Sequence, residues 1–252
     1  MGLTNWLVET GVDSLNTLNT EDAKERILSA SIDLFSRKGF DATRVNEIAE
    51  SAGVNKALIY YYFKNKEDIL DTLLEAVLAK LSASSMEFIN SYIVPMIKAG
   101  RLDIVGERFE FADGEAMEYF QMHMGRYYEK LVDYLLTNRA VVRILMFESL
   151  RSGKHKSILF RLMKLMDKDP SNPIYRTLQS TDEDFDYNEG TIFFKFFFSW
   201  IPLISIAAYY DEYKAKTLLS DESMKELTIR SLENLVRGAQ ERHFVVSALK
   251  ES

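Results

Sequence analysis

Apolar residues recur at intervals of three and four along the first third of the chain, which is the spacing of one face of a helix. The first predicted helix covers residues 21–38 and follows Thr20, whose hydroxyl can cap free N–H groups ahead of two acidic residues. Gly39 can end this helix in a left-handed conformation. Its inward face is predicted to consist of Ile27, Ala30, Leu34 and Phe35.

Two shorter helices follow, separated by a tight turn. The second helix is predicted to begin with Thr43 as its N-cap and to end before Gly53, because glycine tolerates a positive φ. Asn55 can cap a third helix over residues 56–63, so the unit reads as a helix-turn-helix. Apolar spacing turns one face of the third helix inward. The positions left facing outward are Lys56, Ala57, Tyr60 and Tyr61.

The outward face of the third helix carries two large aromatic rings beside a lysine, which is unusual for a surface that meets only water. A DNA duplex is a suitable partner, because its major groove admits a helix and its phosphates accept hydrogen bonds from tyrosine hydroxyls. Taken singly, each residue also has an ordinary interpretation as a solvated charge, a helix cap or a core ring. Their combination at this spacing favours DNA recognition.

The remaining two thirds of the chain are also predicted to be helical. A helix over residues 67–81 links the N-terminal unit to a larger body, and three polar or glycine-bearing stretches separate further helices: 100–114, 169–173 and 181–190. Only 4 prolines and 11 glycines interrupt the 252 residues, which favours long helices over a sheet of many short strands. The predicted fold class is therefore all-α.

Three domains follow from this pattern: an N-terminal extension (1–19), a helix-turn-helix domain (20–66) and a helical body (67–252). The extension permits a short amphipathic helix or a disordered arm, and disorder is the favoured interpretation. Residues 191–210 are apolar enough to suggest a membrane span, but Lys195 and Pro202 favour a buried helix instead.

The net charge of −7 is distributed unevenly along the chain. Residues 20–66 carry eight lysines and arginines against seven acids, so this segment has a net charge of +1 and the rest carries −8. An acidic body would repel DNA and confine contact to one face, although acidic surfaces more often serve solubility. The chain has no cysteine, which excludes disulfides and thiolate metal sites and is compatible with a reducing cytoplasm.

The N-terminal segment resembles the tetracycline-repressor (TetR) family of regulators. The run AKERILSASIDLFSRKGFDATRVNEIAESAGVNKALIYYYFKNKEDIL carries the family's Gly-Phe, Ala-Thr, Ile-Ala, Ala-Gly-Val, Tyr-x-Tyr-Phe and Lys-Glu elements in order and at the family's spacing. The resemblance covers roughly residues 20–81. It implies an all-α repressor that binds palindromic double-stranded operator DNA as a homodimer.

The resemblance also implies a set of DNA contacts. Thr43 and Lys66 are expected to anchor phosphates, whereas Lys56 and Ala57 meet base edges. Tyr60 and Tyr61 are expected to touch the DNA backbone or thymine. Arg44 is a further expected contact, and Asn55 belongs to the same surface. The chain departs from the common family pattern at Asn55, Ala57 and Leu58, so the operator sequence does not transfer.

In TetR-like proteins the body surrounds a cavity for a small-molecule effector. Adaptable methionines and aromatic rings would suit an apolar or amphipathic ligand, although most such helical stripes are simply core. His123 can bond a polar group of a ligand, and a satisfied or exposed histidine is the plainer interpretation. The expected ligand-contacting residues are Met117, Phe120, His123, Met124, Tyr127, Phe147 and Phe197.

The last predicted helix, residues 221–240, carries two apolar stripes, one for its own core and one for a partner. The first stripe contains Met224, Leu227, Ser231 and Leu235, and the second contains Ile229, Leu232, Val236 and Ala239. The resemblance implies that the last two long helices pair with their copies across a two-fold axis. The DNA-contacting third helices of the two copies would then lie about 34 Å apart, which is the length of one turn of DNA.

Other classes of function fit the sequence less well. An enzyme is not indicated, because no nucleophile–base set, metal-ligand spacing or phosphate-binding glycine loop occurs. His155 and His243 form no spaced cluster with His123, so no metal or other cofactor is expected. A protein–protein adaptor using the tyrosine surface and a transcriptional activator of the same fold remain as alternatives.

Overall fold

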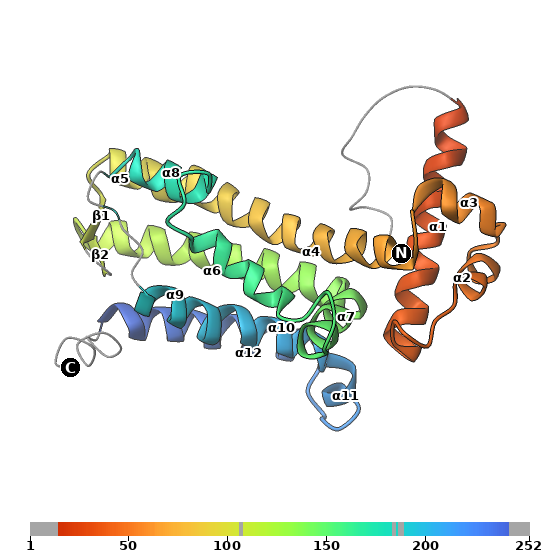
Figure 1. Ribbon diagram of the computed structural model, residues 1–252. Helices are drawn as coiled ribbons and strands as arrows, with labels where there is room; N and C mark the ends of the chain where they lie inside the picture. The colour runs from red at the N-terminus through yellow and green to blue at the C-terminus, as the bar shows by residue number, and fades with distance from the viewer. Residues whose placement is uncertain (1–14, 106–107, 183–184, 186–188, 242–252) are drawn as a thin grey trace.

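The computed structural model describes residues 15–105, 108–182, 185 and 189–241, and shows an elongated molecule with a small helical head at one end of a longer helical body (Figure 1). The head contains α1 (Leu15–Lys38), α2 (Val45–Ala52) and α3 (Lys56–Tyr62), and α4 (Lys66–Phe88) runs from the head along the body. The predicted all-α class is confirmed, apart from one short hairpin.

Helix α1 differs from the prediction at its start. It begins at Leu15 rather than after Thr20, so Thr20 lies inside the helix and residues 15–19 of the expected disordered extension are helical. Residues 1–14 lie outside the described part. The predicted inward face is buried, and Gly39 ends the helix with φ +82°. This left-handed conformation is costly for residues with a Cβ.

Helices α2 and α3 form the predicted helix-turn-helix. The N-cap of α2 is Arg44 rather than Thr43, and the Glu47 carboxylate accepts a hydrogen bond from the Arg44 backbone N–H at 2.9 Å. Gly53 ends α2 with φ +63°. Asn55 caps α3 as predicted, since its side-chain oxygen accepts from the Leu58 N–H at 2.8 Å.

The long helix beginning at α4 extends beyond the predicted end at Leu81. It continues through a π-helical segment, η1 (Ile89–Ile93), into α5 (Val94–Lys98). Pro95 lies just after η1 and has no N–H to donate. The Val94 N–H donates instead to the carbonyl five residues earlier, at Ile89. The backbone hydrogen bonds thus change from the i→i−4 pattern to the i→i−5 pattern just before the proline.

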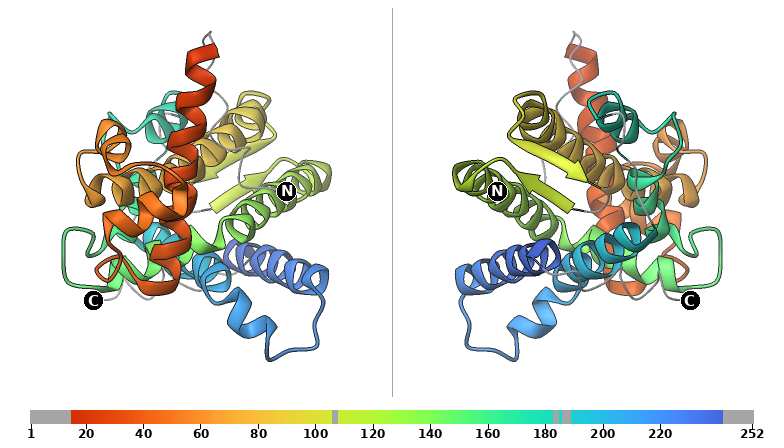
Figure 2. Two further views of the ribbon diagram at one scale, coloured as in Figure 1. Left: turned by 90° about the vertical axis from the view of Figure 1, so that its right-hand side faces the viewer. Right: turned by 90° about the vertical axis from the view of Figure 1, so that its left-hand side faces the viewer.

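A two-stranded antiparallel hairpin, β1 (Leu102–Val105) and β2 (Arg108–Phe111), lies at the end of the body away from the head (Figure 2, right panel). Leu102 pairs with Phe111, and the buried–exposed alternation of β1 turns Leu102 and Ile104 toward the core. We predicted a polar connection over residues 100–114. The period-two pattern is only four residues long, and this is too short to distinguish from a loop in the sequence.

The middle of the body contains α6 (Gly114–Thr137), α7 (Arg139–Leu150), the 3₁₀ helix η2 (Ile158–Met166) and α8 (Pro173–Gln179). Asp113 caps α6 by accepting from the Ala116 N–H at 2.7 Å. The buried Asn172 side chain donates to the Lys164, Leu165 and Asp167 carbonyls and caps α8. It therefore joins the end of η2 to the start of α8.

The apolar stretch at residues 191–210 is divided among α9 (Glu189–Lys195), the π-helical η3 (Phe196–Trp200) and α10 (Ile201–Ala208). Pro202 follows η3 as Pro95 follows η1, and the Ile201 N–H donates to the Phe196 carbonyl. Among the described residues, no helix has the length and apolar character needed to cross a membrane. The chain then forms α11 (Tyr210–Lys214) and α12 (Asp221–Glu241).

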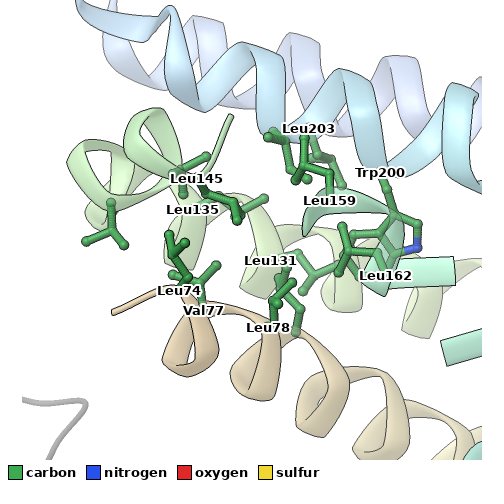
Figure 3. Close-up of a cluster of buried hydrophobic side chains, with 14 of the residues drawn as sticks. Leu74, Val77, Leu78, Leu131, Leu135, Leu145, Leu159, Leu162, Trp200 and Leu203 are labelled. Carbon is green, nitrogen blue, oxygen red and sulfur yellow. The ribbon is translucent and has the colours of Figure 1, made fainter. Parts of the chain in front are cut away.

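The core is continuous from the head to the body. Figure 3 shows its central part, in which leucines of α4 and α6 meet Leu159 and Leu162 of η2 beneath Trp200 and Leu203. Nearly all of these side chains have less than a tenth of their surface exposed. At roughly 25 cal/mol per Å² of apolar surface removed from water, such burial is the main favourable contribution to folding.

The two predicted stripes of α12 are partly regrouped in the structure. Met224 and Leu232 are buried with Thr228, whereas Leu227, Ser231 and Leu235 are exposed. Met224 therefore belongs to the inner face, contrary to the grouping with Leu227. Ile229 and Val236 are half-buried, and the side chain of Ala239 lies outside the described part.

Lys66, at the start of α4, is hydrogen-bonded to the loop between α1 and α2. Its Nζ donates to the Phe40 carbonyl at 2.7 Å and to the Thr43 carbonyl at 2.8 Å, and it lies 4.2 Å from the centre of the Phe40 ring. Hydrogen bonds from a charged donor are stronger than neutral ones. Lys66 therefore connects α4 to the loop that leads into α2.

Replacing this lysine should weaken the head. In Lys66→Met the two carbonyls lose a charged donor, and we expect the free energy of unfolding to fall by about 1–3 kcal/mol in urea denaturation. The matched control is Lys64→Met, since Lys64 is exposed and only its backbone N–H is hydrogen-bonded, to Asp68. Equal destabilisation by the two substitutions would contradict the role assigned to Lys66.

Candidate nucleic-acid interface

Helix α3 presents one face to the core and the opposite face to solvent. Ile59 and Phe63 are 1% and 2% exposed, whereas Tyr60 is 48% and Tyr61 is 76% exposed. Lys56 and Ala57 are also exposed. The predicted division of α3 is confirmed, so its lysine and paired tyrosines are accessible to a partner. The left panel of Figure 2 views the ribbon from the head end.

The exposed side chains of α3 are arranged by contacts with one another. The Lys56 Nζ lies 5.8 Å from the centre of the Tyr60 ring. The Tyr61 ring packs edge-on against Tyr62 at a centroid distance of 5.0 Å, and the half-buried Tyr62 packs in turn against Phe63. A cation near an aromatic face and an edge-to-face ring pair both restrict side-chain freedom. This restriction lowers the entropy lost on binding.

Two further basic side chains border α3. Arg44 is exposed at the start of α2, and Lys64 is exposed in the turn after α3. Asn55 is exposed as well, although its side-chain oxygen is already engaged in capping α3. The hydrogen bonds from Lys38 and from the Arg44 backbone hold the pKa of Glu47 below its usual value. Glu47 is therefore a charged acceptor that orders the loop beside this surface.

Thr43 and Lys66 do not lie on the exposed surface as the phosphate-anchoring prediction requires. Thr43 is 1% exposed, and its hydroxyl donates to the Gly39 carbonyl at 2.9 Å. The Lys66 ammonium is directed into the same loop, toward the Phe40 and Thr43 carbonyls. We therefore assign both side chains to the support of the interface and not to its surface.

Arg26 also supports the interface, although no pattern in the sequence singles it out. From α1, its guanidinium donates to the Ala52 carbonyl at 3.0 Å, at the end of α2. A Cβ on Gly53 would lie 3.4 Å from this guanidinium. The only signal in the sequence is a charged residue beside a buried helix face, which is too common to be diagnostic.

The seven residues expected to contact an effector come from three elements, α6, α7 and η3, and differ widely in exposure. Phe120 and His123 are buried, and Met124 and Tyr127 are half-buried within an aromatic cluster of α4, η1, α6 and the hairpin. The other three side chains are exposed: Met117 (39%), Phe147 (56%) and Phe197 (43%).

The aromatic cluster is closely packed around α6. The His123 ring stacks on Tyr92 at 3.9 Å, and the Tyr127 hydroxyl lies 2.9 Å from the Ser85 hydroxyl. Burial lowers the pKa of His123, and the nearby Arg126 lowers it further. Its Nδ1 has no hydrogen-bond partner among the described residues. Burial also raises the pKa of Tyr127 to about 12, so this phenol stays protonated.

A groove of about 350 Å³ lies between α6 and α12. Its lining includes Met122, Arg126, Lys225 and Ile229, with four glutamates, and none of the seven expected effector residues. Within the part of the chain described, no three histidines or carboxylates are grouped in a way that would hold a metal ion.

Comparisons with known proteins agree with this geometry. The family model for bacterial regulatory proteins of the tetR family matches residues 27–73. The regulator RutR of Escherichia coli (strain K12) is 45% identical over 69 residues, 26% of this chain and 32% of RutR. The negative regulator of the biofilm operon icaADBC, IcaR of Staphylococcus epidermidis, is 44% identical over 46 residues, 18% of this chain and 25% of IcaR. The matches thus cover a third or less of either relative.

Similarity to solved structures extends over most of the chain. A TetR family transcription regulator from Marinobacter aquaeolei VT8 has a TM-score of 0.51 at 14% identity, covering 87% of this chain and 97% of that one. A tetR-family transcriptional regulator from Streptomyces coelicolor has a TM-score of 0.50 at 16% identity, covering 90% of this chain and 81% of that one. The resemblance seen in the sequence is thus confirmed: the chain carries a TetR-family N-terminal domain, joined to a body with the fold of TetR-family regulators.

Proposed function

We propose that the chain is a sequence-specific DNA-binding transcriptional regulator that acts as a homodimer on palindromic double-stranded DNA. The observation that carries the proposal is the outward face of α3, where Lys56, Tyr60 and Tyr61 stand exposed on a rigid helix-turn-helix. Inserted in the major groove, a short helix of this kind brings its first residues to the base edges.

The proposed contacts divide into two classes. Lys56 and Ala57, at the first turn of α3, approach the base edges, where a lysine can donate to guanine and a methyl group can meet thymine. Arg44, Tyr60, Tyr61 and Lys64 contact the sugar–phosphate backbone. Backbone contacts set the position of the helix but carry no direct sequence information. Specificity is therefore concentrated at the start of α3.

The proposed dimer uses the last two long helices. The outer face of α12 exposes Leu227 at 47% and Leu235 at 41%, and on α10 Ile206 is 36% exposed. Exposed apolar residues at helical spacing are costly in water and are buried when two copies pair. A two-fold axis would place the same face of each copy in contact and present two α3 helices to successive major grooves.

Repression relieved by a small apolar or amphipathic molecule is the proposed mode of regulation. IcaR is described as a negative regulator, which supports repression for this chain as well. An effector must prefer the arrangement of heads that does not fit DNA, because a ligand with equal affinity for both arrangements shifts nothing. An activator would use the same interface, with the position of the operator deciding the outcome.

Removing the lysine of α3 should weaken specific recognition. Duplexes are first selected from genomic DNA by binding to the intact protein. We expect Lys56→Ala to reduce the affinity for them by about tenfold to a hundredfold, about 1–3 kcal/mol, because a base-edge contact is lost. Filter binding at two salt concentrations measures the effect.

Two controls accompany this measurement. Lys64→Ala should lower the affinity for selected and for random duplexes by the same factor, because a phosphate contact does not depend on the base sequence. Lys80→Ala changes an exposed lysine of α4 in the body and should leave both affinities unchanged. Weak binding by the intact protein with no dependence on salt would favour a protein–protein adaptor.

The dimer face is tested separately. Placing carboxylates on it by Leu227→Glu with Leu235→Glu should convert the dimer into a monomer, because like charges would face each other across the two-fold axis. Sedimentation equilibrium reports the mass. Leu150→Glu is the control, since Leu150 is 78% exposed on α7 and outside the proposed face. A dimer that persists in the double variant would exclude this face as the interface.

A further inference from the structure

The connection from α7 to η2 carries charge of one sign. Between Glu148 and Asp167 there is no carboxylate, while this stretch has five lysines and arginines and one histidine: Arg151, Lys154, His155, Lys156, Arg161 and Lys164. The protein as a whole has a net charge of −7.

The partners of this basic stretch are acids of the head and of the first half of α4, together with Glu148 near the end of α7, whose carboxylate lies 3.3 Å from the Arg151 guanidinium. Arg151 pairs with Asp41, in the loop between α1 and α2, and Lys154 pairs with Asp71. The His155 Nε2 lies 2.6 Å from the Asp71 Oδ1. Arg161 donates to the Glu75 Oε2 at 2.8 Å. We call these contacts the ionic seam.

The centre of the ionic seam is shielded from water. His155 is 8% exposed, and the Asp71 side chain is one-third exposed. Burial alone would raise the pKa of Asp71, but hydrogen bonds from His155 and Lys154 outweigh burial, so the pKa is lowered. Ion pairs in partly buried positions are screened less by salt than pairs in open solvent. The seam is therefore stronger at Asp71 than at its exposed ends.

The backbone of the basic stretch is held in an unusual conformation. Ser157 has φ +65°, the only positive value at a non-glycine residue in the described part of the chain. Its N–H donates to the Ser149 carbonyl at 2.8 Å. The nine residues of η2 then form a 3₁₀ helix, a form that rarely exceeds four. Strain of this kind persists only where surrounding contacts enforce it.

Apolar contacts anchor η2 beneath the seam. Ile158, Leu159 and Leu162 are buried, and Figure 3 shows Leu159 and Leu162 directed toward the leucines of α4 and α6. The basic side chains thus project from a segment that is fixed in the body. Their partners, Asp41 and Asp71, belong to the head loop and to the helix that enters the head.

We propose that Arg151, Lys154 and His155 are positioning residues, which set the orientation of the DNA-reading head relative to the body. The seam contacts the head itself at the loop before α2, and it contacts the first turns of α4, the helix that enters the head. Two points of attachment restrict rotation, whereas one would act as a pivot. The inference deepens the proposed function, since it names the contacts that align α3 for DNA.

A charge exchange tests the outer pair of the seam. Asp41→Arg and Arg151→Asp each place like charges together, whereas the double variant restores an ion pair with its polarity reversed. The matched control is Glu87→Lys, which breaks a pair with Lys130 that joins α4 to α6. Both of its side chains are exposed, and the pair lies at the far end of α4 from the head.

The orientation of the head is read by the distance between two spin labels. Because the chain has no cysteine, Ser51→Cys in α2 and Glu118→Cys in α6 give a single labelled pair, and both positions are exposed. Excess unlabelled protein ensures that each labelled chain pairs with an unlabelled one. Each single reversal should broaden the distance distribution, and the double variant should narrow it again.

Two results would overturn the proposal in this experiment. One is a distribution that neither single reversal changes. The other is equal broadening by Glu87→Lys, which would indicate general loosening of the body. Thermal unfolding of all variants accompanies the distances. Asp41→Arg is expected to leave the melting midpoint unchanged, because the Asp41 side chain is 69% exposed, whereas Arg151→Asp is expected to lower it, because the new carboxylate also faces that of Glu148.

Binding to the duplexes selected by the intact protein gives the functional readout. Each single reversal should lower the affinity about tenfold, and the double variant should recover most of it. Broadened distances with unchanged affinity would overturn the positioning role. Failure of the proposed function is distinguishable, because then the intact protein selects no duplex while the label distances still report the seam.

Discussion

Helix α4 must pack against both the head and the body within one continuous hydrophobic core, and the rest of the structure depends on this constraint. Leu70, Leu73 and Leu74 are fully buried where the helix lies between the head and α7. Farther along, Val77 and Leu81 belong to the core of the body. Because one helix packs against both the head and the body, a displacement of its body end is carried to the head. The head therefore cannot be oriented independently of the packing of the body.

Polar contacts complement this shared helix. Lys66 fastens its first residue to the loop before α2, and Asp71 and Glu75 on the next turns receive the basic stretch from the body. Asp71 and Glu75 of α4 thus face basic side chains of the body, whereas Lys56 of α3 and Lys64 in the following turn are exposed at the head. This separation explains how a protein with a net charge of −7 can carry a surface suited to a polyanion.

The head was largely predictable because its signals are local. Gly39, Gly53 and Asn55 each occupy a backbone position that few other residues suit, and they define the turn and caps before any tertiary contact is considered. The exposed face of α3 followed from spacing alone. Thr43 and Lys66 were predicted to lie on the DNA-facing surface, but their side chains donate to backbone carbonyls of the neighbouring loop. Every residue has such a carbonyl, so the sequence does not indicate which one will accept a hydrogen bond.

The body was predictable as helical but not in its details. Its hairpin is too short to show a period. The effector residues were chosen by type along one face of α6, and type does not show where along that face neighbouring elements cover it: Met117, in the first turn, is exposed, whereas Phe120, one turn later, is buried. The pairing of Asp71 with His155 joins positions 84 residues apart. No pattern along a single chain contains such a contact.

The two π-helical segments make the helices that contain them sensitive to the deletion of a residue. Each adds one residue to a turn immediately before a proline, at Pro95 and at Pro202. Deleting a single residue there would rotate everything downstream by about 100° about the helix axis, since one turn holds 3.6 residues. Downstream side chains that now point into the core would then point along the side of the helix. These short stretches should thus tolerate exchange of side chains far better than the loss of one position.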